Sequence, residues 1–180
     1  MSDIPAVAPD GAEAWLVTFG PGKIYWERFG HNAIWLREPA EGLDHTFNFG
    51  YFDFDQEDFF LRFMRGRMLY FSIAQPASRE FEFYRGDNRS IRAQKLNLQP
   101  AQYEQLRDYL LNDIRPENRD YRYDYYLNNC STRIRDALDL ALDVPEGCLQ
   151  PVVAPTEITG LADALPDGGD VGGVRADEVG

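Results

Sequence analysis

One stretch of the chain reads Tyr123-Asp124-Tyr125-Tyr126-Leu127-Asn128-Asn129-Cys130-Ser131-Thr132-Arg133. Two asparagines precede Cys130, and asparagine is a preferred helix cap, so the stretch predicts a helix that begins at about Cys130. Apolar residues then recur at helical spacing: Cys130, Ile134, Ala137, Leu138 and Ala141. We therefore expect a helix that packs one face against the core and carries Cys130 in its first turn.

Cys130 has two interpretations at this position. A helix N-terminus carries partial positive charge, which favours the thiolate form of a cysteine, and the thiolate is the nucleophile. A single cysteine on an apolar helix face is also typical of a small core residue. The preceding tyrosines Tyr121, Tyr123 and Tyr125 alternate, which is more typical of packing than of a substrate gate. If Cys130 is catalytic, the rest of the chain must supply a base and an orienting group.

The chain upstream of this helix predicts an antiparallel sheet with further helices, and hence an α+β fold. Apolar runs bounded by turn residues predict strands over residues 14–19, 32–36, 46–49, 68–73 and 90–98. The turn residues over 37–44 predict a hairpin between the second and third of these strands. Apolar stripes predict helices over 56–65 and 100–114 and a short amphipathic segment over 79–84.

Length and composition are those of one globular domain. The chain has 180 residues, of which 44% are hydrophobic and 14% aromatic, so it can bury a core. Its net charge of −12 argues against a nucleic-acid partner, which needs a basic surface. The two cysteines, Cys130 and Cys148, are too few for a disulfide framework, and they show no zinc-ligand spacing with the two histidines. We therefore expect no metal site.

The ends of the chain differ in composition from its centre. Residues 1–12 are small and acidic, and residues 161–180 are rich in glycine and acidic side chains, so both are expected to be disordered around one domain over 13–160. The first twelve residues lack the basic and apolar regions of a signal peptide. Two locations stay open: the cytoplasm, or the periplasm and cell envelope if an export signal was removed.

A catalytic cysteine needs a base, and the chain has two histidines, His31 and His45. His31 begins an apolar strand and could present the base. Asn48, on the next strand, could orient the imidazole, because its amide oxygen can accept from a ring N–H. Each residue also has a structural interpretation, His31 as a hydrogen-bonded core histidine and Asn48 as a solvent-facing strand residue.

Several motifs follow one another along the chain: Thr18-Phe19-Gly20-Pro21-Gly22, Phe29-Gly30-His31-Asn32-Ala33, Phe47-Asn48-Phe49-Gly50-Tyr51-Phe52-Asp53-Phe54, Leu96-Asn97-Leu98 and the stretch that ends at Arg133. In this order they resemble the Lnb-type N-terminal periplasmic domain of bacterial membrane proteins. The resemblance runs from about residue 14 to residue 142. The Gly-His-Asn and Asn-Cys-Ser-Thr motifs are weak alone and specific in combination.

The resemblance implies a circularly permuted papain-like fold, related in layout to the lecithin retinol acyltransferase group, in which the histidine strand precedes the cysteine helix. The helix that bears Cys130 would pack against an antiparallel sheet carrying His31 and Asn48. These three residues would be nucleophile, base and third member of the site. Either Asn129 or the backbone N–H of Cys130 would bind the oxyanion. The candidates on the oxyanion and substrate side are Asn129, Trp26 and Tyr125.

The implied activity is acyl transfer or hydrolysis through a thioester on Cys130, as in the N-acylation of bacterial lipoproteins at the membrane surface. This chemistry requires no metal or organic cofactor. The implied partner is an acyl-bearing small molecule, a lipid or a peptide. Peripheral contact with a membrane and a monomeric state are also expected. Full-length Lnb proteins continue into membrane-spanning helices, which this sequence lacks. The chain is therefore expected to be a bare catalytic module, a soluble relative or a piece of a longer protein.

Three alternatives stay open. A cysteine peptidase or amidase acting on cell-wall or other peptides would use the same pair, and only the pocket distinguishes it: a deep apolar channel favours an acyl chain, a polar groove a peptide. A catalytically inactive binding module predicts that Cys130 is out of reach of His31 or bonded to Cys148. A structural partner domain predicts an exposed apolar patch unrelated to Cys130.

Overall fold

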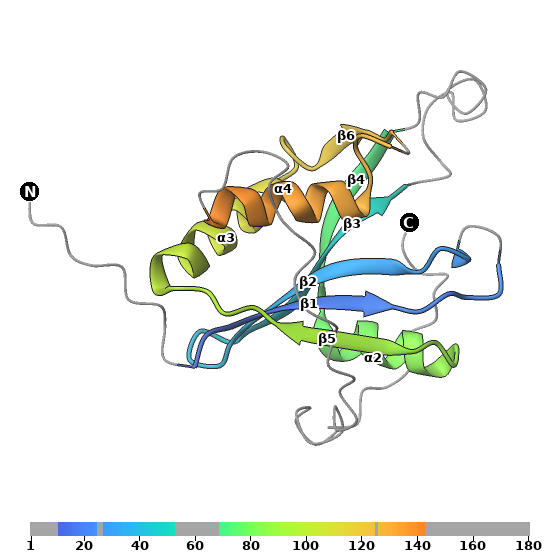
Figure 1. The fold of residues 1–180 in the computed structure, drawn as a ribbon, viewed down its shortest axis with the longest axis horizontal. Helices are drawn as coiled ribbons and strands as arrows, with labels where there is room; N and C mark the ends of the chain where they lie inside the picture. The colour runs from blue at the N-terminus through green and yellow to red at the C-terminus, as the bar shows by residue number, and fades with distance from the viewer. Residues whose placement is uncertain (1–10, 25–26, 53–68, 125, 143–180) are drawn as a thin grey trace, which may run out of the picture.

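A computed structural model of the chain describes residues 11–24, 27–52, 69–124 and 126–142. The elements are β1 (Glu13–Phe19), β2 (His31–Glu38), β3 (Leu43–Tyr51), β4 (Leu69–Pro76), α2 (Ala77–Gly86), β5 (Ile91–Lys95), α3 (Pro100–Asp113), β6 (Asp120–Arg122) and α4 (Cys130–Leu142). The strands form one antiparallel sheet in the order β5-β1-β2-β3-β4-β6 (Figure 1). The described part of the chain therefore has the mixed composition of helices and antiparallel strands that its sequence predicts.

The sheet buries both of its faces, because side chains alternate between the faces along each strand. On one face, Ile34 and Phe47 pack with residues of α3 and α4. On the other face, Ala33 and Trp35 pack with Phe81 of α2. Figure 1 shows α3 and α4 lying together on one side of the strands and α2 on the other. The helix α4 therefore covers the face opposite α2.

Most of the predicted elements are confirmed, with small shifts at their ends. The short segment predicted over 79–84 is part of the longer helix α2. The sequence analysis did not predict β6, whose three residues are too few to show a period and are defined by their pairing with β4. The helix predicted over 56–65, the disorder predicted for the termini and the end of the predicted 13–160 domain lie outside the described residues. Within the described ranges, no helix has the length and apolar character needed to cross a membrane.

β3 is irregular where it approaches the end of the sheet. Its register with β4 shifts between Asn48 and Tyr51, and Gly50 has a φ of +98°, a conformation that favours glycine. A bulge changes which side chains of a strand share a face. Here Tyr51 lies edge-on to His31, with 6.5 Å between the ring centroids. The bulge therefore brings a tyrosine beside the histidine at the start of β2.

Candidate functional site

His31 and Asn48 meet on neighbouring strands. β2 and β3 form the predicted hairpin, and Ala33 lies opposite Asn48 in its register. His31 precedes Ala33 by two positions, so it projects from the same face of the sheet as Asn48. The Nε2 atom of His31 lies 2.8 Å from Oδ1 of Asn48. The structure thus brings together the two residues that the sequence analysis predicted as base and orienting group, and Asn48 is fully buried rather than solvent-facing.

The amide of Asn48 has one orientation that fits its surroundings. Its Nδ2 lies 3.3 Å from the backbone oxygen of Thr46 and 3.1 Å from Oε2 of Glu80, and it donates to both. Oδ1 then faces His31, so the ring must carry its proton on Nε2 to make the 2.8 Å hydrogen bond. A neutral His31 therefore has its lone pair on Nδ1, and this nitrogen can accept a proton.

Burial controls the protonation of His31. Desolvation lowers the pKa of the imidazole, the hydrogen bond to Asn48 opposes this, and the positive charge of Arg89 lowers the pKa further. The net direction is downward from the ordinary value of 6.5. His31 is therefore neutral at neutral pH, which is the state that a general base needs.

Cys130 begins α4 at a capped N-terminus. Oδ1 of Asn129 accepts hydrogen bonds from the backbone N–H groups of Ser131 and Thr132, at 2.9 and 3.0 Å. The hydroxyl oxygen of Thr132 accepts from the N–H of Asn129 at 2.8 Å. This reciprocal cap fixes the first turn and confirms the helix start that the asparagine pair predicts. The thiol of Cys130 is free and half-buried.

One hydrogen bond ties the cysteine helix to the histidine strand. Asn32, which follows His31, donates from Nδ2 to the hydroxyl of Ser131, which follows Cys130, at 3.1 Å. Asn32 is itself held by the hydroxyl of Thr18, which donates to its Oδ1 at 2.8 Å. Although α4 packs on the face opposite α2, His31 and Cys130 border the same cavity. The cavity is therefore lined both by His31 of the sheet and by the first turn of the helix that packs on the other face.

The site cavity measures about 680 Å³, which lies in the size range of small-molecule sites. Besides Cys130 and His31, it is lined by many aromatic side chains, among them Phe49, Tyr51, Phe52, Tyr70, Tyr84 and Tyr123. Tyr70 and Tyr123 stack on each other with 4.3 Å between their ring centroids. The cavity therefore combines walls rich in aromatic rings with polar side chains, a thiol, an imidazole and the first turn of a helix.

Arg89 brings a buried positive charge to the same cavity. Its Nε donates to the backbone oxygen of Gly20 at 2.8 Å, and its Nη1 lies 3.4 Å from Oε1 of Glu27. The guanidinium also lies over the ring of Tyr84, 4.5 Å from the centroid. These contacts hold Arg89 in place, and the carboxylate of Glu27 balances its positive charge. From this position its charge contributes to the lowered pKa of His31.

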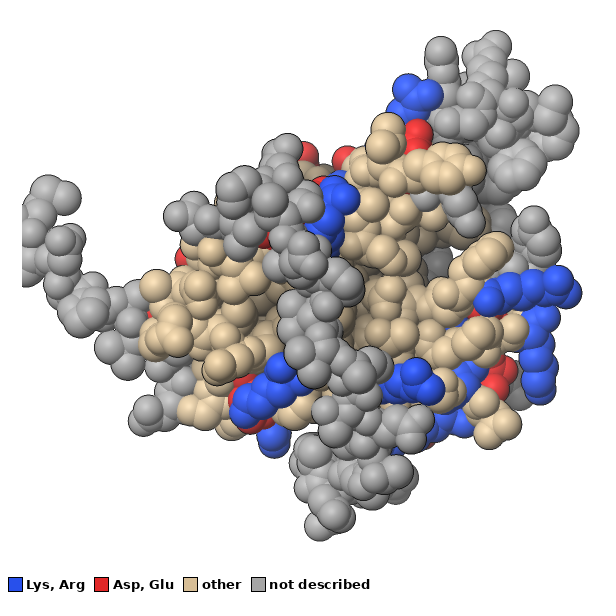
Figure 2. Space-filling model, in the orientation of Figure 1, with Lys and Arg blue, Asp and Glu red and all other residues tan. Residues whose placement is uncertain are grey.

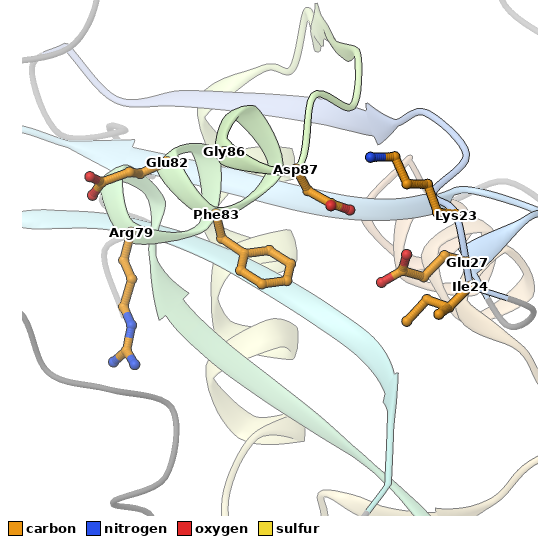
Figure 3. A pocket seen from close by; sticks show the side chains of 8 residues that line it. All are labelled: Lys23, Ile24, Glu27, Arg79, Glu82, Phe83, Gly86 and Asp87. Carbon is orange, nitrogen blue, oxygen red and sulfur yellow. The ribbon is translucent and has the colours of Figure 1, made fainter.

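A shallow groove adjoins the site cavity and shares Glu27 and Phe83 with it. Figure 3 shows Phe83 extending from α2 toward the side formed by Ile24 and Glu27. The charged residues of the groove are Lys23, Glu27, Arg79, Glu82 and Asp87. Phe83 is 62% exposed, and Phe29, on the cavity lining, is 76% exposed. Exposed aromatic rings and charges of both signs therefore surround this side of the cavity.

The remaining predicted site residues have different outcomes. Asn129 borders the cavity; its Oδ1 accepts from the helix N–H groups, and its Nδ2 is the side-chain donor that an oxyanion would use. Trp26 and Tyr125 lie outside the described residues. Tyr121 is buried, as predicted for packing, whereas Tyr123 lines the cavity. In the part of the chain that the structure describes, no three His, Cys, Asp or Glu side chains group closely enough to hold a metal ion.

Gly30 directs the backbone into His31, and its replacement gives a testable prediction. Gly30 has a φ of +72°, and a Cβ atom there would lie 2.6 Å from the backbone oxygen of Phe19. Gly42 has a similar φ of +69°, but nothing lies within 4 Å of a Cβ atom there. Left-handed backbone costs an alanine about 1–2 kcal/mol at either position, and only at Gly30 does a clash add to it. In urea unfolding we expect Gly30→Ala to lose clearly more stability than the matched Gly42→Ala; equal losses would contradict the close contact.

The sequence analysis missed Glu80, Arg89 and Tyr51 as residues around the site. Glu80 did carry a signal, because it falls on the buried stripe of α2 with three other residues: Ala77, Phe81 and Tyr84. A carboxylate on an apolar stripe is rarely buried without a partner. Arg89 lies in the turn after α2, where no periodic pattern marks a buried position.

Comparison with models of protein families assigns the chain to one family. The model of the family described as the Lnb N-terminal periplasmic domain matches residues 5–156, which is most of the chain. This match confirms the resemblance that the motifs indicate. No curated protein and no solved structure is significantly similar to the chain.

Proposed function

The chain belongs to the family of Lnb N-terminal periplasmic domains, and from this premise we propose that it is a thiol-dependent acyltransferase or acyl hydrolase. Cys130 is the nucleophile, His31 the general base and Asn48 the residue that orients the imidazole. The observation that carries the proposal is the 2.8 Å hydrogen bond between His31 and Asn48 beside a cavity that also contains a free thiol at a helix N-terminus. A permuted papain-like layout accounts for the chain order, in which the histidine strand precedes the cysteine helix.

The reaction proceeds in two halves. Nδ1 of His31 takes the thiol proton of Cys130, and the sulfur attacks the carbonyl carbon of the acyl donor, whose π electrons move to the oxygen. The tetrahedral adduct collapses when the bond to the leaving group breaks and protonated His31 gives that group the proton. Water, an amine or an alcohol then attacks the thioester, with His31 again taking a proton and returning it to the sulfur. The chemistry needs no cofactor.

The oxyanion of each tetrahedral adduct needs hydrogen-bond donors at the start of α4. The backbone N–H of Cys130 lies in the first turn, where N–H groups lack partners within the helix. The cap on Asn129 fixes this turn, so the donor stands ready before the reaction. The Nδ2 group of Asn129 is the second candidate donor. The partial positive charge of the helix N-terminus adds to the stabilisation.

The substrate class follows from the cavity walls. Aromatic rings bind the methylene groups of an acyl chain without requiring hydrogen bonds, so an acyl-bearing lipid or small molecule is the proposed donor. The exposed rings of Phe29 and Phe83 suit peripheral contact with a membrane surface. Figure 2 shows Lys and Arg side chains at several separate places on the visible face and not gathered in one patch. Lipoproteins of the cell envelope are consistent with the family description as a periplasmic domain.

A cysteine peptidase or amidase is the second candidate function, and the groove beside the cavity favours it. The groove carries charges of both signs and is continuous with the site through Glu27 and Phe83. Polar side chains of this kind would suit a peptide chain. The same residues would carry out the chemistry, so only substrates separate the two candidates. An inactive binding module is less well supported, because the thiol of Cys130 is free and borders the same cavity as His31.

Alkylation of Cys130 by iodoacetamide tests the proposed pair directly. The rate is measured from about pH 5 to about pH 9, and mass spectrometry separates Cys130 from Cys148. We expect fast alkylation of Cys130 at neutral pH, because the helix N-terminus and His31 favour the thiolate. His31→Ala should slow this alkylation, whereas the matched His45→Ala should leave its rate unchanged. Slow alkylation that does not depend on His31 would contradict the proposal.

A further inference from the structure

Glu80 is a buried carboxylate that the proposed chemistry does not use. It lies on the buried side of α2 and is only 2% exposed. Its Oε2 accepts a hydrogen bond from Nδ2 of Asn48 at 3.1 Å. Asn48 in turn contacts His31 at 2.8 Å. Three side chains from β2, β3 and α2 therefore form one hydrogen-bonded chain that ends at the cavity.

We propose that Glu80 is a positioning residue of this site, which holds the Asn48 amide with its oxygen toward His31 and thereby sets which ring nitrogen is the base. The inference rests on the proposed function for its catalytic meaning. Its structural content, the tautomer of His31, can be measured without any activity.

The reason lies in the two ends of an amide. Oδ1 and Nδ2 have nearly the same shape, so only hydrogen-bond partners decide which end faces His31. The Nδ2 end has two acceptors, the backbone oxygen of Thr46 at 3.3 Å and Glu80 at 3.1 Å. If the amide turned over, Nδ2 would face the ring and require the lone pair on Nε2. The proton of neutral His31 would then sit on Nδ1, and the base would be lost.

Glu80 is the stronger of the two restraints. Its contact with Asn48 is the shorter one, at 3.1 Å against 3.3 Å for Thr46, and its side-chain oxygen accepts the hydrogen bond from the amide. Turning the amide would also place Oδ1 of Asn48 against Oε2 of Glu80, two oxygens in a buried site. Such a contact costs free energy, because two acceptor oxygens cannot form a hydrogen bond with each other. The backbone oxygen of Thr46 opposes the same turn, over its longer contact of 3.3 Å.

The charged and titratable groups around His31 come from several elements. They are Cys130 of α4, Tyr51 of β3, Glu80 and Tyr84 of α2, and Glu27 and Arg89 from the flanking loops. Burial, with a contribution from the charge of Glu80, raises the pKa of Tyr51 to about 12, and burial raises the pKa of Tyr84 as well. Both tyrosines therefore stay neutral over the alkylation range. Burial raises the pKa of Glu80 itself, opposed by hydrogen bonds from Thr46 and Asn48.

The first experiment measures the tautomer of His31 by nitrogen-15 NMR of the ring, assigned with His31→Ala. In the wild-type protein we expect the proton of neutral His31 on Nε2. Glu80→Met, which keeps the length of the side chain but has no carboxylate, should shift a measurable fraction to the Nδ1-protonated form. Glu80→Gln retains an acceptor oxygen at the same distance and should behave like wild type. Glu41→Gln, an exposed acidic position outside both the cavity and the groove, is the control.

The second experiment repeats the alkylation of Cys130 with these variants. With Glu80→Met the alkylation rate of Cys130 at neutral pH should fall about tenfold, because His31 no longer presents the nitrogen that takes the thiol proton. Glu80→Asp keeps the charge but is one methylene shorter, so a positioning role predicts loss here too. A role of charge alone predicts no loss. Glu80→Asp also keeps the test decisive if the methionine variant fails to fold.

The outcomes separate this inference from the proposed function. A wild-type His31 protonated on Nδ1, or a tautomer unchanged in both Glu80→Met and Glu80→Asp, would overturn the role of Glu80 whatever Cys130 does. A tautomer that depends on Glu80 together with an ordinary, slow thiol would support the positioning role and overturn only the catalytic pair. If the tautomer of His31 and the alkylation of Cys130 both depend on Glu80, and Glu80→Gln behaves like wild type, the results support the positioning role and the proposed function.

Discussion

Replacing Cys130 with alanine is expected to abolish acyl transfer from p-nitrophenyl octanoate, a probe whose acyl chain suits an aromatic cavity. The side chain of Cys130 supplies the only atom that becomes covalently bonded to the acyl group in the proposed reaction. Its loss should lower kcat/KM by on the order of 10³-fold or more, as removal of a catalytic nucleophile does elsewhere. The wild-type protein should release a burst of p-nitrophenolate, and mass spectrometry should find one octanoyl group on Cys130.

Ser131→Ala is the matched control for this experiment. The hydroxyl of Ser131 lies 4.0 Å from the sulfur of Cys130 and accepts from Asn32, so it shares the surroundings of the thiol without being the proposed nucleophile. We expect this variant to keep the burst and the octanoyl adduct. A burst that survives in Cys130→Ala but disappears in Ser131→Ala would assign the nucleophile to the serine. Wild-type protein that cleaves only peptide amides would favour the peptidase alternative.

Replacing Arg133 with methionine is expected to cause the largest loss of stability. Arg133 of α4 lies 2.6 Å from Oδ1 of Asp113 at the end of α3, and only 15% and 10% of the two side chains are exposed. Its guanidinium also lies over the rings of Tyr121 and Phe49, at 4.0 and 5.4 Å from their centroids. Arg133→Met leaves a buried carboxylate without its partner, which costs about 3–5 kcal/mol. Urea unfolding with an unchanged m-value measures this loss.

A second ion pair on α4 provides the control. Arg135 lies 2.6 Å from Oδ1 of Asp136, but 46% and 51% of these side chains are exposed. Arg135 also lies 3.9 Å from the buried carboxylate of Asp139, so the control replaces the exposed partner instead. An exposed pair contributes about 0–1 kcal/mol, so Asp136→Asn should change the free energy of unfolding little. The double variant Arg133→Met with Asp113→Leu should recover much of the lost stability, because no unpaired charge remains. Equal effects of Arg133→Met and Asp136→Asn would show that burial does not decide the strength of these pairs.

Local patterns predicted the elements and three members of the candidate site. The hairpin over 37–44 placed Asn48 near His31 because antiparallel neighbours joined by a short turn have nearly fixed register. The asparagine cap placed Cys130 at a helix start because capping depends on residues within one turn. The three-residue strand β6 was missed, since it is held by pairing with β4 and has no period of its own. The order of the strands in the sheet and the packing of the helices on it could not be predicted from such local patterns.

The sequence by itself determined what each segment of this chain becomes: a hairpin that joins His31 to Asn48, and a helix that begins at Cys130. These features depend on neighbours within a few residues or across one turn. Only the tertiary structure decided that α4 packs on the face opposite α2 while Cys130 still shares a cavity with His31. It also decided that Glu80 supports Asn48 from α2. Such contacts join segments far apart in sequence, and they are set by how buried side chains pack together, which no local pattern contains.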